Sequence, residues 1–134
     1  ELWTEQFISL LSKKLSINGR LITYSSASSV RASLRKAGLK IYSISPIIDR
    51  DRKWSSGTVA VKTPFNNKKL LKSYQFRDLS LMELEHLKTR SSIPYRDPTG
   101  KAKSREIISI REIEQSKSQL IKTSSWRKRW NPAQ

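Results

Sequence analysis

The sequence predicts an α/β protein in which a short sheet is followed by a basic extension. Residues 1–63 alternate a helical pattern with short β-rich runs, in the order helix, strand, helix, strand, strand. Only a loop separates the last two strands, so this pair should be antiparallel. After Pro64 the chain becomes more polar and richer in turn residues. We therefore expect an α/β segment over 1–63 and a basic, helical and irregular extension over 64–134.

The first helix is predicted over residues 1–15, whose apolar positions recur at the spacing of an amphipathic helix. No Ser, Thr, Asp or Asn precedes the helix to cap its first turn, which suggests further sequence upstream of Glu1, although a frayed native terminus would look similar. Asn18 and Gly19 supply the positive-φ residues that end a helix. The apolar positions are Leu2, Trp3, Phe7, Ile8, Leu10, Leu11 and Leu15.

Three strands and a second helix are predicted in the rest of the α/β segment. The strands cover residues 20–24, 39–45 and 58–62, where β-branched and aromatic residues gather. Serines at 25–28 offer N-caps for a helix that ends before Gly38. Pattern alone fits any α/β domain with an antiparallel edge strand equally well. The basic residues of this helix that we expect to face outward are Arg31, Arg35 and Lys36.

The extension contains two predicted helices and an irregular stretch. A short helix over 79–87 begins with Ser80 and Glu83 at capping-box spacing. Two prolines and a glycine make residues 93–100 irregular. Apolar residues at helical spacing predict a longer helix over 104–120, and the chain then closes on a basic tail with two tryptophans.

The charge of the chain predicts a polyanionic partner. The 27 Lys and Arg residues outnumber the 11 Asp and Glu residues and give a formal net charge of +16. The excess is spread along the chain, with +7 (11 basic minus 4 acidic) in residues 1–63 and +9 (16 minus 7) in 64–134. Nucleic acid is the first candidate, since a basic surface is the electrostatic footprint of nucleic-acid binding.

Other partner classes have less support in the sequence. The chain has no cysteine and one histidine, so neither a disulfide nor a zinc site is expected, and we predict no metal. No apolar run approaches the roughly 20 residues of a membrane span, and no basic helix with a continuous apolar face stands out. We therefore expect a soluble, cytoplasmic protein that does not bind membranes.

Several short motifs follow one another along the chain. They are Leu-Trp-Thr at 2–4, Asn-Gly-Arg-Leu-Ile-Thr-Tyr-Ser-Ser-Ala at 18–27, Val-Arg at 30–31, Ala-Gly-Leu at 37–39, Gly-Thr-Val-Ala at 57–60 and Pro-Tyr-Arg-Asp-Pro at 94–98. In this order they resemble the methyltransferase part of the MnmC family and its stand-alone relatives. The resemblance implies a Rossmann-like class I methyltransferase sheet that uses S-adenosylmethionine. It also implies methylation of the 5-aminomethyl group of the wobble uridine in certain tRNAs, a step of 5-methylaminomethyl-2-thiouridine synthesis.

The chain departs from this family in what should precede these motifs. A methyltransferase of this class has a glycine-rich turn after its first strand and an acidic residue for the ribose, whereas the four glycines here never approach Gly-x-Gly spacing. We therefore expect the C-terminal portion of a longer enzyme, inactive on its own. The alternative is a non-enzymatic basic RNA-binding protein. An exposed edge of such a partial sheet could also pair two copies into a homodimer.

Candidate pocket residues follow the first strand, where ligands of open α/β sheets bind. Tyr24, Ser25 and Ser26 could line the methyl-transfer pocket. The serines could equally well only cap the next helix. Methyl transfer to an amine depends on positioning and desolvation, so no catalytic triad is expected.

Candidate nucleic-acid contacts combine basic and aromatic side chains, because phosphates pair with cations and bases stack on rings. The loop after Pro46 and the C-terminal tail have this composition. Each has a plainer explanation, since basic loops are common on so basic a protein and the tryptophans of the tail could dock on their own domain. We give His86 no functional role. The candidates are Arg31, Arg35, Arg50, Arg52, Lys53, Trp54, Arg96, Trp126, Arg127, Lys128, Arg129 and Trp130.

Overall fold

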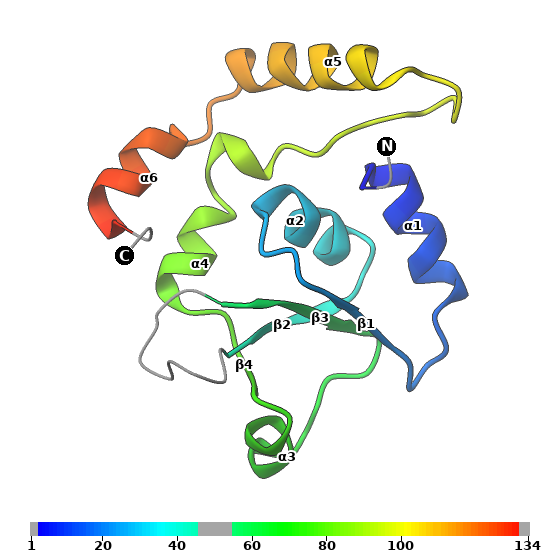
Figure 1. Cartoon of the computed structure of the whole chain (residues 1–134), viewed down its shortest axis with the longest axis vertical. Coiled ribbons are helices and arrows are strands. Elements are labelled where there is room, and N and C mark those ends of the chain that lie inside the picture. The colour runs from blue at the N-terminus through cyan, green and yellow to red at the C-terminus, as the bar shows by residue number, and fades with distance from the viewer. Residues whose placement is uncertain (1–2, 46–54, 132–134) are drawn as a thin grey trace.

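The computed structural model describes residues 3–45 and 55–131 (Figure 1). The predicted order helix, strand, helix, strand, strand is confirmed, and the chain is α/β. The described elements in chain order are α1 (Glu5–Lys14), β1 (Arg20–Thr23), α2 (Ser28–Lys36), β2 (Lys40–Ile44), β3 (Gly57–Val61), α3 (Lys68–Ser73), β4 (Phe76–Arg77), α4 (Leu81–His86), the 3-10 helix η1 (Arg90–Ser92), α5 (Ser104–Lys117) and α6 (Thr123–Trp130).

Strand β3 lies inside the sheet, between the two strands that precede it in the chain. Among the described residues the sheet has four strands in the order β1-β3-β2-β4. The predicted antiparallel pairing of β2 with β3 is confirmed, with Lys40 opposite Val61. Strand β1 also pairs antiparallel with β3, so β1 and β2 run in the same direction on either side of β3. All five residues of β3 are buried, which is typical of a central strand.

Strand β4 comes from the extension and was not predicted. Its two residues, Phe76 and Arg77, pair with Ile44 and Ser43 of β2. A run of two residues is too short to show the alternation by which strands are recognised. The extension therefore contributes an edge strand to the sheet, whereas the boundary at residue 63 stays a prediction.

The sheet has an apolar core on each face, and Figure 1 shows α1 and α2 on one side of the sheet and α3 on the other. Cross-strand neighbours Ile41 and Ala60 point to the side covered by α1 and α2, where they pack with Ile8 and Leu34. The next pair, Tyr42 and Val59, points to the opposite side, toward α3. Successive residues of a strand face opposite sides of the sheet, so these two sets follow from the register. The partners on the second face are Val61, Phe65, Leu71 and Phe76.

Helix α1 is shorter than predicted and has a cap. Thr4 is its N-cap and accepts a hydrogen bond from the Phe7 N–H at 3.2 Å, and Glu5 lies in the first turn. The expectation of a helix without an N-cap is wrong, because the helix begins at Glu5, after Thr4, although the apolar spacing continues upstream to Leu2 and Trp3 in the sequence. The capping box of α4, between Ser80 and Glu83, is confirmed.

Two helices of the extension were not predicted. Helix α3 has only six residues, and none of them is fully buried. So short a segment shows little of the apolar spacing from which a helix is predicted. Helix α6 covers the basic tail, for which no helix was predicted, and α5 ends at Lys117 rather than at residue 120. Within the described residues, none of the helices has the length and apolar character needed to cross a membrane.

Candidate functional site

A buried arginine joins α2 to the sheet. Arg31 is 1% exposed. Its Nε donates to Thr58 Oγ1 at 2.8 Å, and its Nη2 donates to Ser55 Oγ at 2.6 Å. Arg31 lies one turn before the buried Leu34, on the side of α2 that packs on the sheet. The prediction that Arg31 faces outward to contact nucleic acid is therefore wrong.

Glu83 of α4 balances the charge of Arg31. Arg31 Nη1 donates to Glu83 Oε2 at 2.7 Å, and both side chains are almost fully buried. Arg77 and the Ser80 hydroxyl donate to the second carboxylate oxygen at 2.5 Å and 3.0 Å. Burial raises the pKa of Glu83, but hydrogen bonds from Ser43, Arg77, Ser80 and Arg31 outweigh it and hold the pKa at about 2. Glu83 is thus ionised, and it ties α4 to both α2 and the sheet.

A cavity of about 410 Å³ lies beside the C-terminal end of β1 and the first turn of α2. Of the three predicted pocket residues, Ser25 is among those that line it. Tyr24 is 95% exposed, and Ser26 is half-buried. Ser25 Oγ accepts a hydrogen bond from the Ala27 N–H at 3.3 Å, so it also shapes the turn into α2. The residues that line the cavity are Trp3, Ser25, Ala27, Ser28, Ser29, Val30, His86, Ser91, Tyr95 and Arg111.

Sequence reasoning missed the part of this cavity that the extension supplies. His86, Ser91, Tyr95 and Arg111 come from α4, η1, the irregular stretch and α5. They lie at least 58 residues after Ser28 in the chain, so no local pattern could have placed them beside α2. Only the packing of the extension over α2 brings them together.

His86 lies in the cavity wall as a neutral side chain. Its ring stacks on Trp126 with centroids 4.1 Å apart. Burial, with a smaller effect of the charges of Arg31 and Arg127, lowers the pKa of His86 to about 4 against an opposing effect of Glu83. At neutral pH the imidazole therefore adds no charge to the cavity.

Replacing His86 with phenylalanine should flatten the dependence of stability on pH between 6.5 and 4. The folded protein holds His86 neutral, whereas the unfolded chain takes up a proton below pH 6.5, so stability is lost as the pH falls through this window. The loss should be about 1 kcal/mol after allowance for solvent screening. Thermal unfolding at pH 7 and pH 5 measures it. If the wild type and His86→Phe lost the same stability between pH 7 and pH 5, the lowered pKa of His86 would be contradicted.

Comparison with known proteins finds two similarities. A family model described as S-adenosyl-L-methionine-dependent methyltransferase matches residues 1–60. The crystal structure of MNMC2 from Aquifex aeolicus superposes with a TM-score of 0.71 at 26% identity, over 87% of this chain. Both matches support a similarity to MnmC-like S-adenosyl-L-methionine-dependent methyltransferases. It spans 34% of the length of the Aquifex protein, and no curated protein sequence matches it.

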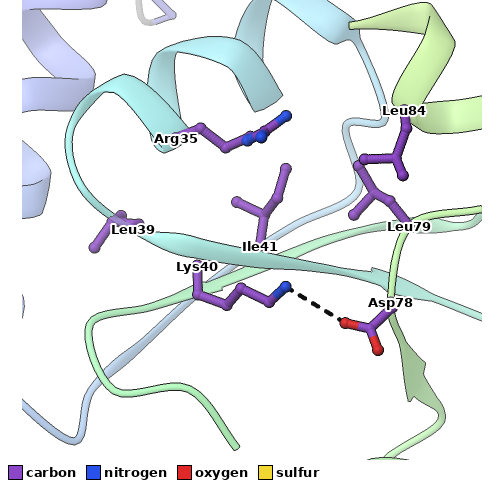
Figure 2. A pocket seen from close by; sticks show the side chains of 7 residues that line it. All are labelled: Arg35, Leu39, Lys40, Ile41, Asp78, Leu79 and Leu84. Atoms are coloured by element: carbon purple, nitrogen blue, oxygen red, sulfur yellow. Dashed lines mark ion pairs between the residues drawn. The ribbon is translucent and has the colours of Figure 1, made fainter.

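Arg35 of this MnmC-like chain lies at a second cavity, of about 330 Å³, between α2, β2 and the segment before α4. Figure 2 shows its side chain reaching over Ile41 toward Leu79 and Leu84. Lys40 and Asp78, which also line this cavity, pair at 3.5 Å. Arg35 is exposed, so its predicted contact with nucleic acid stays a prediction.

The two tryptophans of the C-terminal tail pack against other residues of the same chain. Trp126 is 5% exposed, and its indole N–H donates to the Met82 carbonyl at 2.9 Å. Trp130 donates to Glu85 at 2.7 Å, and Arg129 pairs with the same carboxylate at 3.3 Å. Trp126 is therefore covered and cannot stack on a base in this fold, which contradicts its predicted role.

The remaining candidates of the MnmC-like chain divide into exposed, paired and undescribed residues. Arg127 and Lys128 are exposed on α6. Arg96 bridges two acidic residues, Glu5 at 3.2 Å and Glu114 at 3.1 Å. No group of three His, Asp or Glu side chains that could hold a metal ion occurs within 3–45 and 55–131. The loop candidates Arg50, Arg52, Lys53 and Trp54 lie outside the described residues.

Proposed function

We propose that this chain is the C-terminal portion of an S-adenosylmethionine-dependent tRNA methyltransferase. Its substrate in this proposal is the 5-aminomethyl group of the wobble uridine, and the product is the 5-methylaminomethyl nucleoside. The observation that carries the proposal is the similarity to MNMC2 over 87% of the chain. The charge of +16 adds support, because tRNA is a polyanion. A cytoplasmic location goes with this proposal.

The residues of this chain do not by themselves fit the cofactor. The cavity beside β1 has no carboxylate among its described lining residues, so it lacks the acidic residue that holds the ribose hydroxyls in enzymes of this class. The glycines at 19, 38, 57 and 100 are too far apart for a turn that cradles a nucleotide. In our proposal, S-adenosylmethionine is bound by residues outside this chain, and it supplies an electrophilic methyl group.

The part of the chemistry that falls to this chain is the placement of the RNA. An amine attacks a methyl group only as the free base in line with the carbon, so orientation and exclusion of water dominate the rate. The turn at residues 24–27 and the cavity beside it lie at the end of β1, where open α/β sheets bind their ligands. We propose that Tyr24, Ser25 and Ser26 border the nucleoside there.

The test is methyl transfer to tRNA by the chain expressed together with any coding sequence upstream of Glu1. Transfer of a labelled methyl group to unmethylated tRNA, with the product nucleoside identified by mass spectrometry, would support the proposal. Labelled product at any other nucleoside would contradict the wobble-uridine assignment. Binding of tRNA without methyl transfer would favour the second candidate, a non-enzymatic RNA-binding protein, which the same positive charge supports.

The free edge of β1 bears on the proposed homodimer. Strand β1 bonds to β3 on one side, and its other edge has no strand partner among the described residues. A second copy could pair with this edge, as could further strands of the same protein. The edge can pair with a second copy or with further strands of the same protein, but not with both. The molar mass from light scattering, measured on the chain with and without any sequence encoded upstream, distinguishes these two cases.

Binding of tRNA to this chain should weaken steeply with salt. If about 6 to 10 cations contact phosphates, affinity should fall roughly 10³-fold or more between 50 and 200 mM salt, because each contact releases counterions. Fluorescence anisotropy of labelled tRNA at increasing salt measures the slope. A flat salt response would rule out the electrostatic part of the proposal.

A further inference from the structure

The cavity beside β1 combines three features that together suit an anion. It presents the first turn of α2, a buried serine hydroxyl and an arginine, and no acidic side chain of the described residues lines it. The three features are backbone N–H groups, a hydroxyl and a guanidinium. The arginine comes from α5, far from α2 in the chain.

The first turn of α2 has no side-chain cap. Its N-cap is Ala27, whose side chain has no polar atom to accept a hydrogen bond from the N–H groups of the first turn. The first N–H groups of a helix have no partner within the helix, and the helix dipole adds partial positive charge at this end. Ser28, Ser29 and Val30 of this turn all line the cavity.

The hydroxyl of Ser28 is buried without a partner. Ser28 is 2% exposed, and its Oγ makes no hydrogen bond to any described residue. A buried hydroxyl that lacks a partner costs free energy, so such groups are rare in folded proteins. Because Ser28 lines the cavity, a ligand oxygen there would supply the missing partner.

Arg111 of α5 brings a charge that only neutral groups contact. Its Nε donates to the Ile93 carbonyl at 2.7 Å, and Nη2 donates to the Ser91 carbonyl at 3.0 Å. Nη1 donates to the Tyr95 hydroxyl at 3.3 Å, and the guanidinium lies 4.3 Å from the centroid of that ring. Each terminal nitrogen has a second N–H. These contacts fix the guanidinium beside α2 and leave its charge unbalanced within the described residues.

We infer that this cavity binds a phosphate group of the RNA backbone through the first turn of α2, the Ser28 hydroxyl and Arg111. The inference rests on the proposed function, because it takes tRNA as the ligand. A tetrahedral phosphate presents several acceptor oxygens, which backbone N–H groups, a hydroxyl and a guanidinium can share. A phosphate fixed here would hold the backbone of the tRNA beside the turn at residues 24–27.

The test compares the complete chain with two variants and a matched control. Ser28→Ala removes only the unpartnered hydroxyl, and Arg111→Gln removes the charge. Arg105→Gln removes the same charge from an exposed position of α5 that is not among the lining residues. Inorganic phosphate and tRNA are the two probes, measured by thermal shift and by anisotropy at several salt concentrations.

We expect inorganic phosphate to raise the melting temperature of the wild type and of Arg105→Gln, but not of the two site variants. For tRNA, Ser28→Ala and Arg111→Gln should each lose about 5- to 10-fold in affinity, and Arg111→Gln should lower the salt slope by about one contact. Ser28→Ala should melt at or above the wild-type temperature without phosphate, because it removes an unsatisfied group. This result keeps the test valid even if Arg111→Gln disturbs folding.

Two results would overturn the inference. One is an equal phosphate shift, or none, in all four proteins. The other is a phosphate shift confined to the wild type and Arg105→Gln with unchanged tRNA affinity in both site variants, which would make the site one for free phosphate. Failure of the wild-type chain to bind tRNA at all would instead count against the proposed function, while the phosphate measurement would still test the site.

Discussion

Replacing Glu83 with alanine is expected to lower the free energy of unfolding by about 3–5 kcal/mol, because it leaves a buried arginine without its counter-charge. Arg31 would keep its contacts to hydroxyls and to the Gly57 carbonyl. Burial already lowers the pKa of Arg31, and the carboxylate of Glu83 opposes that effect. Urea denaturation followed by circular dichroism measures the loss.

The control is Glu112→Ala, which removes the same charge from an exposed position of α5 and should change stability little. A double variant, Arg31→Met with Glu83→Leu, should recover only part of the loss, because it removes the unpaired charge but leaves Ser55, Thr58 and Ser80 without these partners. If Glu83→Ala and Glu112→Ala lowered the free energy of unfolding by similar amounts, a stabilising role of the buried Arg31–Glu83 pair would be contradicted.

Acid should destabilise the protein through the same carboxylate. The pKa of Glu83 is held at about 2, below its ordinary value of 4.5, so its contribution to stability is present above pH 4.5. The contribution is lost as the pH falls from 4.5 toward 2, in a window below that of His86.

Replacing Trp126 with alanine should lower the free energy of unfolding by about 3–5 kcal/mol, as for other buried aromatic residues. The variant would lose the stack on His86 and leave the Met82 carbonyl without the indole N–H. Trp130→Ala is the control, because Trp130 is half-buried and its indole donates to a partly exposed carboxylate. Its loss should be the smaller one by thermal unfolding.

The two tryptophan variants also separate structure from RNA binding. If Trp126→Ala melted like the wild type but bound tRNA less tightly, Trp126 would be an RNA contact, and the docked position described above would not be its working state. We expect the reverse, a lower melting temperature together with unchanged tRNA affinity at temperatures where the variant is folded.

The order of elements in the first segment could be predicted because it depends on local pattern. Residues 20–24 and 58–62 gather β-branched side chains, and Gly38 follows α2 with the positive φ expected after a helix. Asn18 and Gly19 lie between α1 and β1, but the prediction that they have positive φ is wrong. The capping box at Ser80 and Glu83 was visible for the same reason, since its partners are three residues apart. Such signals need no knowledge of the rest of the chain.

The site depended on contacts that no local pattern contains. Glu83 was predicted only as a capping residue, although its carboxylate also meets Arg31 from 52 residues away in the chain. Arg31 itself was assigned to the surface because arginine is seldom buried. Only the placement of α4 against α2 explains why this arginine lies inside, and for the same reason Arg111 could not be assigned to the cavity.

The position of β3 inside the sheet has a consequence for how the protein is made. During synthesis β1 and β2 leave the ribosome first, and they share no backbone hydrogen bonds with each other, because β3 lies between them. Neither strand has its ladder partner until residues 57–61 emerge. The joining of β1 to β2 through β3 is therefore a late step of folding, whatever else pairs with the free edge of β1.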